Sequence, residues 1–470
     1  NIHKKGRLVP PKMRPLAIFS PSPWSNGFID VYEKSDSKSW PEAAFRGERE
    51  MLEDVMFEEF FDGHSRIQVL RNGPSGPLLE GFAKELFQAR YAEITARRHI
   101  RAAEHLIYWS GSQGIPPSGF TEKLVDRFDR HINQCRCPHY GHTHRLALLN
   151  GARLFLKFLE GAGQITTSST EPTVQDPALL TAFRQWMRQQ RGTCEPTLYN
   201  YSLSIRDFLK RFGEDPGRFE ARGLREFVLE RSHQCGLSAA KTCTTALRMF
   251  LRFLVTQGQC SADLVAAVPV LAHWRLSSLP SYLQQEEVER IVSSCDPNSP
   301  VGRRDVAILL LLARLGLRAG DIIQLCLGDL DWEEGMIRVS GKGRREVRLP
   351  LTQEVGWAIV TYLRNGRPPT ETDVLFVRSR APYRPFACHS AVSVIVERAM
   401  RRAGITCQSR GAAHVLRHSV ATSMLRQGAS LQDIAALLRH RSIETTQIYA
   451  KVDVSDLHQV AQPWPEVRPC

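Results

Sequence analysis

The sequence predicts a mainly α-helical chain with a small β-sheet confined to its C-terminal third. One observation is an internal repeat, because Arg153–Leu159 (RLFLKFL) lines up with Arg248–Leu254 (RMFLRFL). The other is a pair of strand-like segments, Met336–Ser340 and Glu346–Leu351, on either side of a Gly-Lys-Gly turn. Two helical modules are therefore expected ahead of a C-terminal domain that holds one hairpin.

Length and charge narrow the possible organisation and partners. A chain of 470 residues is long enough for about three domains of ~150 residues each. It carries 62 Lys and Arg against 49 Asp and Glu, a net charge of +13, which suits a polyanion such as DNA. On its own, this excess would equally serve solubility.

The cysteines and the lack of long apolar segments argue against a secreted or membrane protein. Eleven cysteines lie at irregular spacing, with no signal peptide and no apolar run near ~18 residues. We expect free thiols in a soluble, cytoplasmic protein without a membrane partner.

Residues 1–77 form an N-terminal region that the sequence leaves unassigned. Its aromatic residues and prolines show little periodicity, which is compatible with partial disorder. The region ends in a turn-rich run, Asn72–Pro77 (NGPSGP).

The repeat divides the next 200 residues into a first module at 78–170 and a second at 171–278. Thr166–Pro172 and Leu276–Ser281 are the expected linkers, and each copy of the repeat continues to a Gly-Gln pair.

A second pair of matching segments supports the repeat. Thr95–Ile107 and Thr197–Leu209 share an amphipathic pattern with basic residues on the polar side. The modules are either DNA-contacting bundles or a scaffold that spaces domains. The basic residues on these helices favour DNA contact.

A cluster of cysteines and histidines in the first module, Cys135–His144 (CRCPHYGHTH), suggests a metal site. Its Cys-x-Cys spacing is tighter than the Cys-x2-4-Cys of most structural zinc sites, and no second ligand pair follows at finger spacing. We therefore expect no metal and a basic, His-rich loop near DNA phosphates, with zinc as the alternative.

Six polar residues follow one another through the last third of the chain. Arg318 follows an apolar, helix-like run at Val306–Leu315, and the spacing of His414 and Arg417 places both on one helical face. The full series, which can hold and attack one phosphodiester, is Arg318, Lys342, His414, Arg417, His440 and Tyr449.

This ordered series resembles the catalytic domain of tyrosine recombinases, the phage integrase family, from about Leu279 to Asp453. The resemblance implies a tyrosine-recombinase catalytic domain at 279–470. The module at 171–278 then has the position of the family's core-binding domain, and 78–170 resembles an additional core-binding-like module. The expected fold is thus a tandem of helical modules followed by the catalytic domain.

The resemblance also implies roles for the residues that meet the phosphate. Arg318 and Arg417 would grip its nonbridging oxygens and neutralise charge in the transition state. Tyr449 would be the nucleophile, and His414 is the expected acceptor of its proton.

Other matched positions would assist. Lys342, at the tip of the hairpin, is the expected general acid, and His440 would hydrogen-bond the phosphate. Asp321 matches an acidic position that supports its neighbours. Arg439 stands where the family commonly has Gly, and we expect Arg439 and Arg441 to contact DNA.

These roles predict a site-specific recombinase, an integrase or transposase of a mobile element. It would act on double-stranded DNA recombination sites as a homotetramer on two duplexes, with accessory transposition proteins and near the nucleoid, and without any cofactor. The 21 residues after Tyr449 would dock either on a neighbouring subunit or on the subunit to which they belong. The alternatives are a type IB-like topoisomerase and a catalytically inactive DNA-binding relative.

Overall fold

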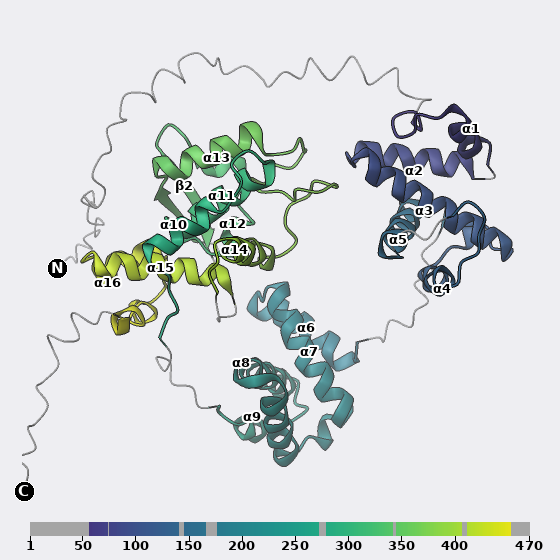
Figure 1. Cartoon of the computed structure of the whole chain (residues 1–470). Coiled ribbons are helices and arrows are strands. Elements are labelled where there is room, and N and C mark those ends of the chain that lie inside the picture. Colours follow the sequence, from purple (N-terminus) through teal and green to yellow (C-terminus); the bar gives the residue numbers. More distant parts are fainter. Residues whose placement is uncertain are drawn as a thin grey trace, which may run out of the picture. The chain divides into compact units, whose positions relative to one another are not determined.

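The computed structural model describes residues 56–73, 75–140, 145–165, 176–271, 279–341, 345–406 and 411–452 (Figure 1). The chain divides into two compact units, Asn1–Gly73 and Pro74–Cys470. The described part is mainly helical with one small antiparallel sheet, so the predicted fold class is confirmed. The predicted linker at Thr166–Pro172 lies outside the described residues.

The described part of the first unit is a turn followed by helix α1 (His64–Asn72). Phe57 and Phe60 of the turn are buried, and the guanidinium of Arg71 donates to both carboxylate oxygens of Glu58 at 3.2 Å. Helix α1 ends at Asn72 and the next helix begins at Gly76. The break between them therefore lies within the predicted turn-rich run, Asn72–Pro77.

Four helices make up the first helical module: α2 (Gly76–Gln88), α3 (Glu93–Ser112), α4 (Glu122–Ile132) and α5 (Arg145–Gly161). Helix α3 packs against α5 at Gly151, where an added Cβ would lie 2.6 Å from Cβ of Ala102. Thr121 caps α4, because its hydroxyl accepts from Leu124 N at 3.3 Å. Phe82, Phe128 and Phe155 fill the interior.

The second helical module consists of α6 (Ala178–Arg191), α7 (Glu195–Phe212), α8 (Ala221–Thr256) and α9 (Ala262–Ala267). Helix α8 is broken at Gly236, whose φ of 75° lies in the left-handed region. The core is rich in phenylalanine, including Phe183, Phe208 and Phe250.

Matching turns support the sequence repeat. Its two copies lie in α5 and α8, which pack against α3 and α7 respectively. Each copy runs into a glycine with the same φ of 67°, Gly163 after α5 and Gly258 after α8. A side chain rarely adopts this angle, so both copies need glycine to end the helix in the same way.

Helix α11 (Pro300–Ala313) is central to the last region. It is buried along most of its length and contacts α10 (Gln285–Ser293), α13 (Gln353–Asn365), α14 (Ser390–Arg402) and α15 (Ala412–Arg426). The short helix α12 (Ala319–Ile322) follows, and α16 (Leu431–Leu437) comes after α15. A run of leucines from Leu309 to Leu312 explains why α11 is buried on several sides.

The sheet of this region has the order β1 (Leu330–Asp331), β2 (Met336–Gly341), β3 (Arg345–Pro350). All pairings are antiparallel, with Val339 opposite Val347 and Ile337 opposite Leu349. The observed strands agree with the predicted ones to within one residue at each end.

Two general expectations can be compared with the described residues. Every cysteine described there is a free thiol. In the same part of the chain, no helix combines the length and apolar character needed to cross a bilayer.

Candidate active site

Arg417 is the more deeply buried of the two predicted site arginines. It lies in the middle of α15 with 5% of its surface exposed, and its guanidinium donates to the carbonyl oxygens of Gly316 and Leu438. Gly316 has a φ of 57°, and an added Cβ would lie 2.7 Å from the Leu438 side chain. Glycine is therefore required where this turn meets the end of α16.

Arg318 approaches the same carbonyl from the start of α12. Its Nη2 donates to Leu438 O at 3.4 Å and to Arg439 O at 3.2 Å, while its side chain keeps 32% exposure. Burial, followed by the charges of Arg318 and Arg439, lowers the pKa of Arg417 to about 9. Arg417 is thus still charged at pH 7. The guanidinium groups of Arg318 and Arg417 both donate to the Leu438 carbonyl.

Asp321 and Arg439 form a buried ion pair beside these arginines. Arg439 Nη2 donates to Asp321 Oδ2 at 2.7 Å, and the two side chains are 5% and 8% exposed. The same oxygen accepts from Arg318 N at 3.2 Å, which supports the orienting role predicted for Asp321.

The burial of Arg439 bears on its predicted contact with DNA. Its backbone has a φ of 52°, a left-handed angle that glycine adopts most easily. Its side chain turns inward to Asp321, so this structure favours a structural role over the DNA contact we predicted. Arg441, two residues later, is exposed as a DNA contact requires.

The two predicted histidines lie in different surroundings. His414 is exposed near the start of α15, whereas His440 shares a hydrogen bond of 2.8 Å between its Nδ1 and the hydroxyl of the buried Thr446. Burial, and then the charges of Arg417 and Arg318, lower the pKa of His440 to about 4. His440 is therefore neutral at pH 7 and can donate only from the nitrogen that carries its proton.

Tyr449 is buried, with 1% of its surface exposed, at the start of a 3₁₀ helix (Tyr449–Val452) that packs on α15. Its hydroxyl is 2.8 Å from Nδ1 of His418. Burial raises the pKa of Tyr449 to about 12, although the charge of Arg417 opposes the shift. The phenol is therefore protonated at pH 7.

His418 is the site residue that the sequence reasoning missed. Burial lowers its pKa to about 4, helped by His414 and Arg417, so the ring is neutral at pH 7. The available signal was its position, because it directly follows Arg417 and lies four residues after His414 on the same helical face.

Lys342 lies outside the described residues. The strands β2 and β3 that lead to it are described. The structure brings together the other five predicted catalytic residues and Asp321: the arginines and Asp321 through hydrogen bonds, and the histidines and Tyr449 by packing and charge.

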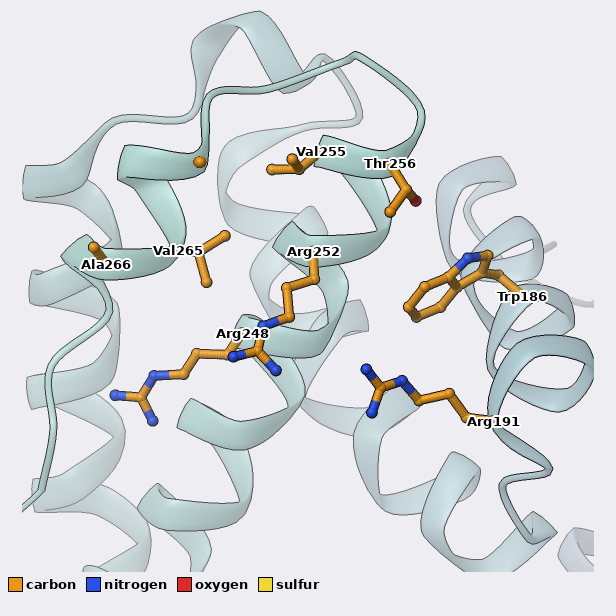
Figure 2. Close-up of a pocket in the computed structure, with 9 residues that line it drawn as sticks. Trp186, Arg191, Arg248, Arg252, Val255, Thr256, Val265 and Ala266 are labelled. Carbon is orange, nitrogen blue, oxygen red and sulfur yellow. The ribbon is translucent and has the colours of Figure 1, made fainter.

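A separate pocket lies in the second helical module between α6, α8 and α9. It has a volume of about 590 Å³, and Trp186 and Val265 are among the apolar residues that line it. Figure 2 shows the guanidinium groups of Arg191 and Arg252 pointing into the same space from facing helices. Arg248 is engaged otherwise, since it donates to the carbonyls of Val268 and Pro269 at 2.9 Å.

Several known proteins are similar to this chain in sequence. Residues 281–456 match the Phage integrase family. The chain is 36% identical over 408 residues to a Sinorhizobium fredii protein named "Putative integrase/recombinase y4rA", covering 84% of this chain and 97% of that one. It is 31% identical over 300 residues to the tyrosine recombinase XerD of Yersinia pestis, covering 61% and 97%.

Among solved structures, the chain is similar to XerH site-specific recombinase in a post-cleavage complex with palindromic difH substrate. The similarity has a TM-score of 0.49 at 20% identity and covers 73% of this chain and 95% of that one.

The low pKa of His418 predicts a specific sensitivity to acid. An unfolded chain protonates this ring near its ordinary pKa of 6.5, whereas the folded chain resists until about 4. Stability is therefore complete above pH 6.5 and is lost as pH falls towards 4, by about 2 kcal/mol at pH 5. Scanning calorimetry at pH 7 and pH 5 should show a smaller acid shift for His418→Asn than for the unaltered chain.

The exposed His389 provides the control. The variant His389→Asn should keep the full acid shift. An equal shift in the His418→Asn variant would show that the buried ring does not resist protonation.

Proposed function

Because the chain belongs to the phage integrase family of tyrosine recombinases, we propose that it is a site-specific DNA recombinase of a mobile element. It would cut and rejoin DNA through a 3'-phosphotyrosyl intermediate, with neither metal nor ATP in the reaction. The observation that carries this proposal is the convergence of Arg318 and Arg417 on the Leu438 carbonyl, in a site that also holds Tyr449.

The two arginines suit a phosphodiester. Planar guanidinium groups can each donate two parallel hydrogen bonds to nonbridging phosphate oxygens. Arg417 is fixed by backbone carbonyls before any ligand binds, so little rearrangement would be needed as negative charge grows in the transition state. Arg318, which is partly exposed, would complete the clamp from the open side.

The nucleophile would be the phenolic oxygen of Tyr449. It attacks phosphorus, the bond from phosphorus to the 5' oxygen breaks, and the phenolic proton passes to a neighbouring base. We expected His414 in that role, but the contact at 2.8 Å supports His418 as the first acceptor. The buried hydroxyl would have to move to reach DNA, and His414 could take the proton in the moved position.

The leaving 5' oxygen needs a proton, for which we propose Lys342. Rejoining reverses the two steps, because a 5' hydroxyl attacks the phosphotyrosyl bond and restores the phenol. The ester keeps the energy of the broken bond, so no other energy source is required.

The helical modules would hold the DNA on which this chemistry acts. Exposed Arg191 and Arg252 of the second module, together with Arg441 near the active site, offer positive charge to phosphates. XerD of Yersinia pestis matches 61% of this chain. The unmatched part is long enough to contain the first module, which would be an additional DNA-binding element. We further propose a homotetramer on two duplexes, assisted by accessory transposition proteins.

A nicked suicide substrate tests the function itself. An active recombinase or a type IB-like topoisomerase becomes trapped on such DNA as a covalent adduct, whereas an inactive DNA-binding relative does not. Strand exchange between two sites then separates recombinase from topoisomerase.

The first prediction concerns the nucleophile. Tyr449→Phe removes one hydroxyl and few contacts with phosphate, so the covalent adduct should disappear while DNA affinity stays nearly unchanged. Denaturing gels of the suicide reaction and binding isotherms measure the two effects. Adduct formation by this variant would exclude Tyr449 as the nucleophile.

The second prediction separates catalysis from binding at the arginines. Arg318→Ala should slow single-turnover cleavage by a factor on the order of a hundred, about 3 kcal/mol of transition-state stabilisation, and weaken binding far less. Arg417→Ala should lose at least as much, and calorimetry would show whether it also unfolds. Comparable rates for the unaltered chain and Arg318→Ala would remove Arg318 from the site.

The third prediction tests the general acid. Lys342→Ala should cleave ordinary DNA poorly and recover on a substrate with a 5'-bridging phosphorothiolate, because sulfur leaves without a proton. Arg318→Ala is the matched control and should gain little, since its defect lies in charge stabilisation. Equal rescue of both variants would assign the general acid elsewhere.

A further inference from the structure

Four potential metal ligands meet in the first helical module. His105 lies in α3, His131 in the last turn of α4, and Cys135 and Cys137 in the segment that follows α4. One ligand atom from each, two imidazole nitrogens and two sulfurs, all lie within 4.8 Å of one another.

The distances inside the cluster fit tetrahedral coordination. Sγ of Cys135 is 3.3 Å from Nε2 of His105, and Sγ of Cys137 is 3.4 Å from Nε2 of His131. With a Zn–S bond of about 2.3 Å and a Zn–N bond of about 2.0 Å, a tetrahedron separates sulfur from nitrogen by about 3.5 Å. These two distances are close to that value, and all four ligand atoms lie within 4.8 Å of one another.

We propose that His105, His131, Cys135 and Cys137 bind one zinc ion as a structural site. Two thiolates and two imidazoles are a ligand set typical of structural zinc. Four protein ligands fill a tetrahedron and leave no open position for water or substrate. The ion is therefore structural, and it is separate from the phosphodiester chemistry, which uses no metal.

The site explains how the segment after α4 is held. Helix α4 ends at Ile132, and Arg136, Pro138 and His139 that follow are exposed, so the segment has little apolar surface to anchor it. His139 also has a φ of 70°, an angle that costs energy in a residue with a side chain. A zinc ion would fix this segment to α3 and α4 at once.

Aromatic rings support the two histidines. The ring of His105 stacks on Tyr140 at 4.4 Å and 6°, and that of His131 stacks on Trp109 at 5.1 Å and 21°. These contacts set the ring orientations before an ion binds, which reduces the entropy lost on coordination. His105 is 2% exposed, so the ion would be shielded on that side.

The order of the four ligands along the chain explains why the sequence did not predict a metal site. A zinc finger would place the second ligand pair after Cys135 in the sequence. The two histidines instead precede the cysteines, His131 by four residues and His105 by 30. His142 and His144, which made the sequence cluster look dense, lie outside the described residues.

Metal analysis of the full-length chain is the first test. Protein purified without chelator should contain one zinc per chain by inductively coupled plasma mass spectrometry. Replacement by Co²⁺ should give the visible absorption of tetrahedral cobalt and the near-ultraviolet band of thiolate ligation. Chain without stoichiometric zinc that also gives no such cobalt spectrum would overturn the proposal.

Matched variants locate the ion. Cys135→Ser, Cys137→Ser and His131→Asn should each retain less than roughly a tenth of the zinc, since loss of one of four ligands weakens binding strongly. The controls, exposed Cys235→Ser and exposed His139→Asn, should keep one zinc per chain. Equal zinc content in the cluster variants and the controls would place the ion elsewhere.

Proteolysis of the unaltered chain avoids the risk that a variant fails to fold. Arg136 is an exposed trypsin site between the two cysteines. Removing zinc with a chelator should accelerate cleavage after Arg136 at least roughly tenfold, and adding zinc back should reverse the change. An unchanged rate would reject a structural role for the ion. None of these measurements depends on DNA cleavage, so they stand apart from the proposed recombinase activity.

Discussion

The placement of Arg417 is the constraint on which the candidate active site depends. A guanidinium buried within a helix must recover the hydration it loses, and here the carbonyls of Gly316 and Leu438 replace water. These carbonyls belong to a turn before α12 and to the end of α16, so one side chain ties three separate segments together. Arg318, Asp321 and His440 all lie on the segments that Arg417 joins.

The same constraint explains the electrostatics. Arg318, Arg417 and Arg439 lie together with the carboxylate of Asp321, so positive charge is in excess by two before any ligand binds. Burial, and after it repulsion from the neighbouring arginines, lowers the pKa of Arg417 and of His440. Repulsion among the arginines destabilises such a site, and a bound anion reduces this repulsion. The site therefore favours binding of a phosphodiester over binding of a neutral ligand.

Much of this arrangement could be predicted from the sequence because its signals are local. The spacing of His414 and Arg417 defines one helical face, and alternating residues around a Gly-Lys-Gly turn define the hairpin to within one residue. The inward turn of Arg439 and the bond from Tyr449 to His418 could not be predicted. Both join residues at least 31 positions apart, and which of two nearby histidines meets a tyrosine is decided by tertiary packing.

The cysteine cluster shows a similar limit. Its two cysteines are separated by one residue in the sequence, but His105 reaches them only because α3 runs beside the segment that follows α4. A search along the chain uses ligand spacings known from other proteins, whereas the fold is free to bring a ligand from any helix that passes close by. In this module the packing of helices, rather than a contiguous motif, brings the four side chains together.

In the proposed reaction, the burial of the Tyr449 hydroxyl would separate binding to DNA from cleavage of DNA. A phenol with 1% surface exposure and a pKa of about 12 is a poor nucleophile towards any phosphate that the protein meets while searching a genome. Collisions with unrelated sequences would end in dissociation, because they do not last long enough to draw the tyrosine out. In the proposed reaction, the fidelity of cleavage would then depend on how long a complex with DNA survives as well as on how tightly it forms.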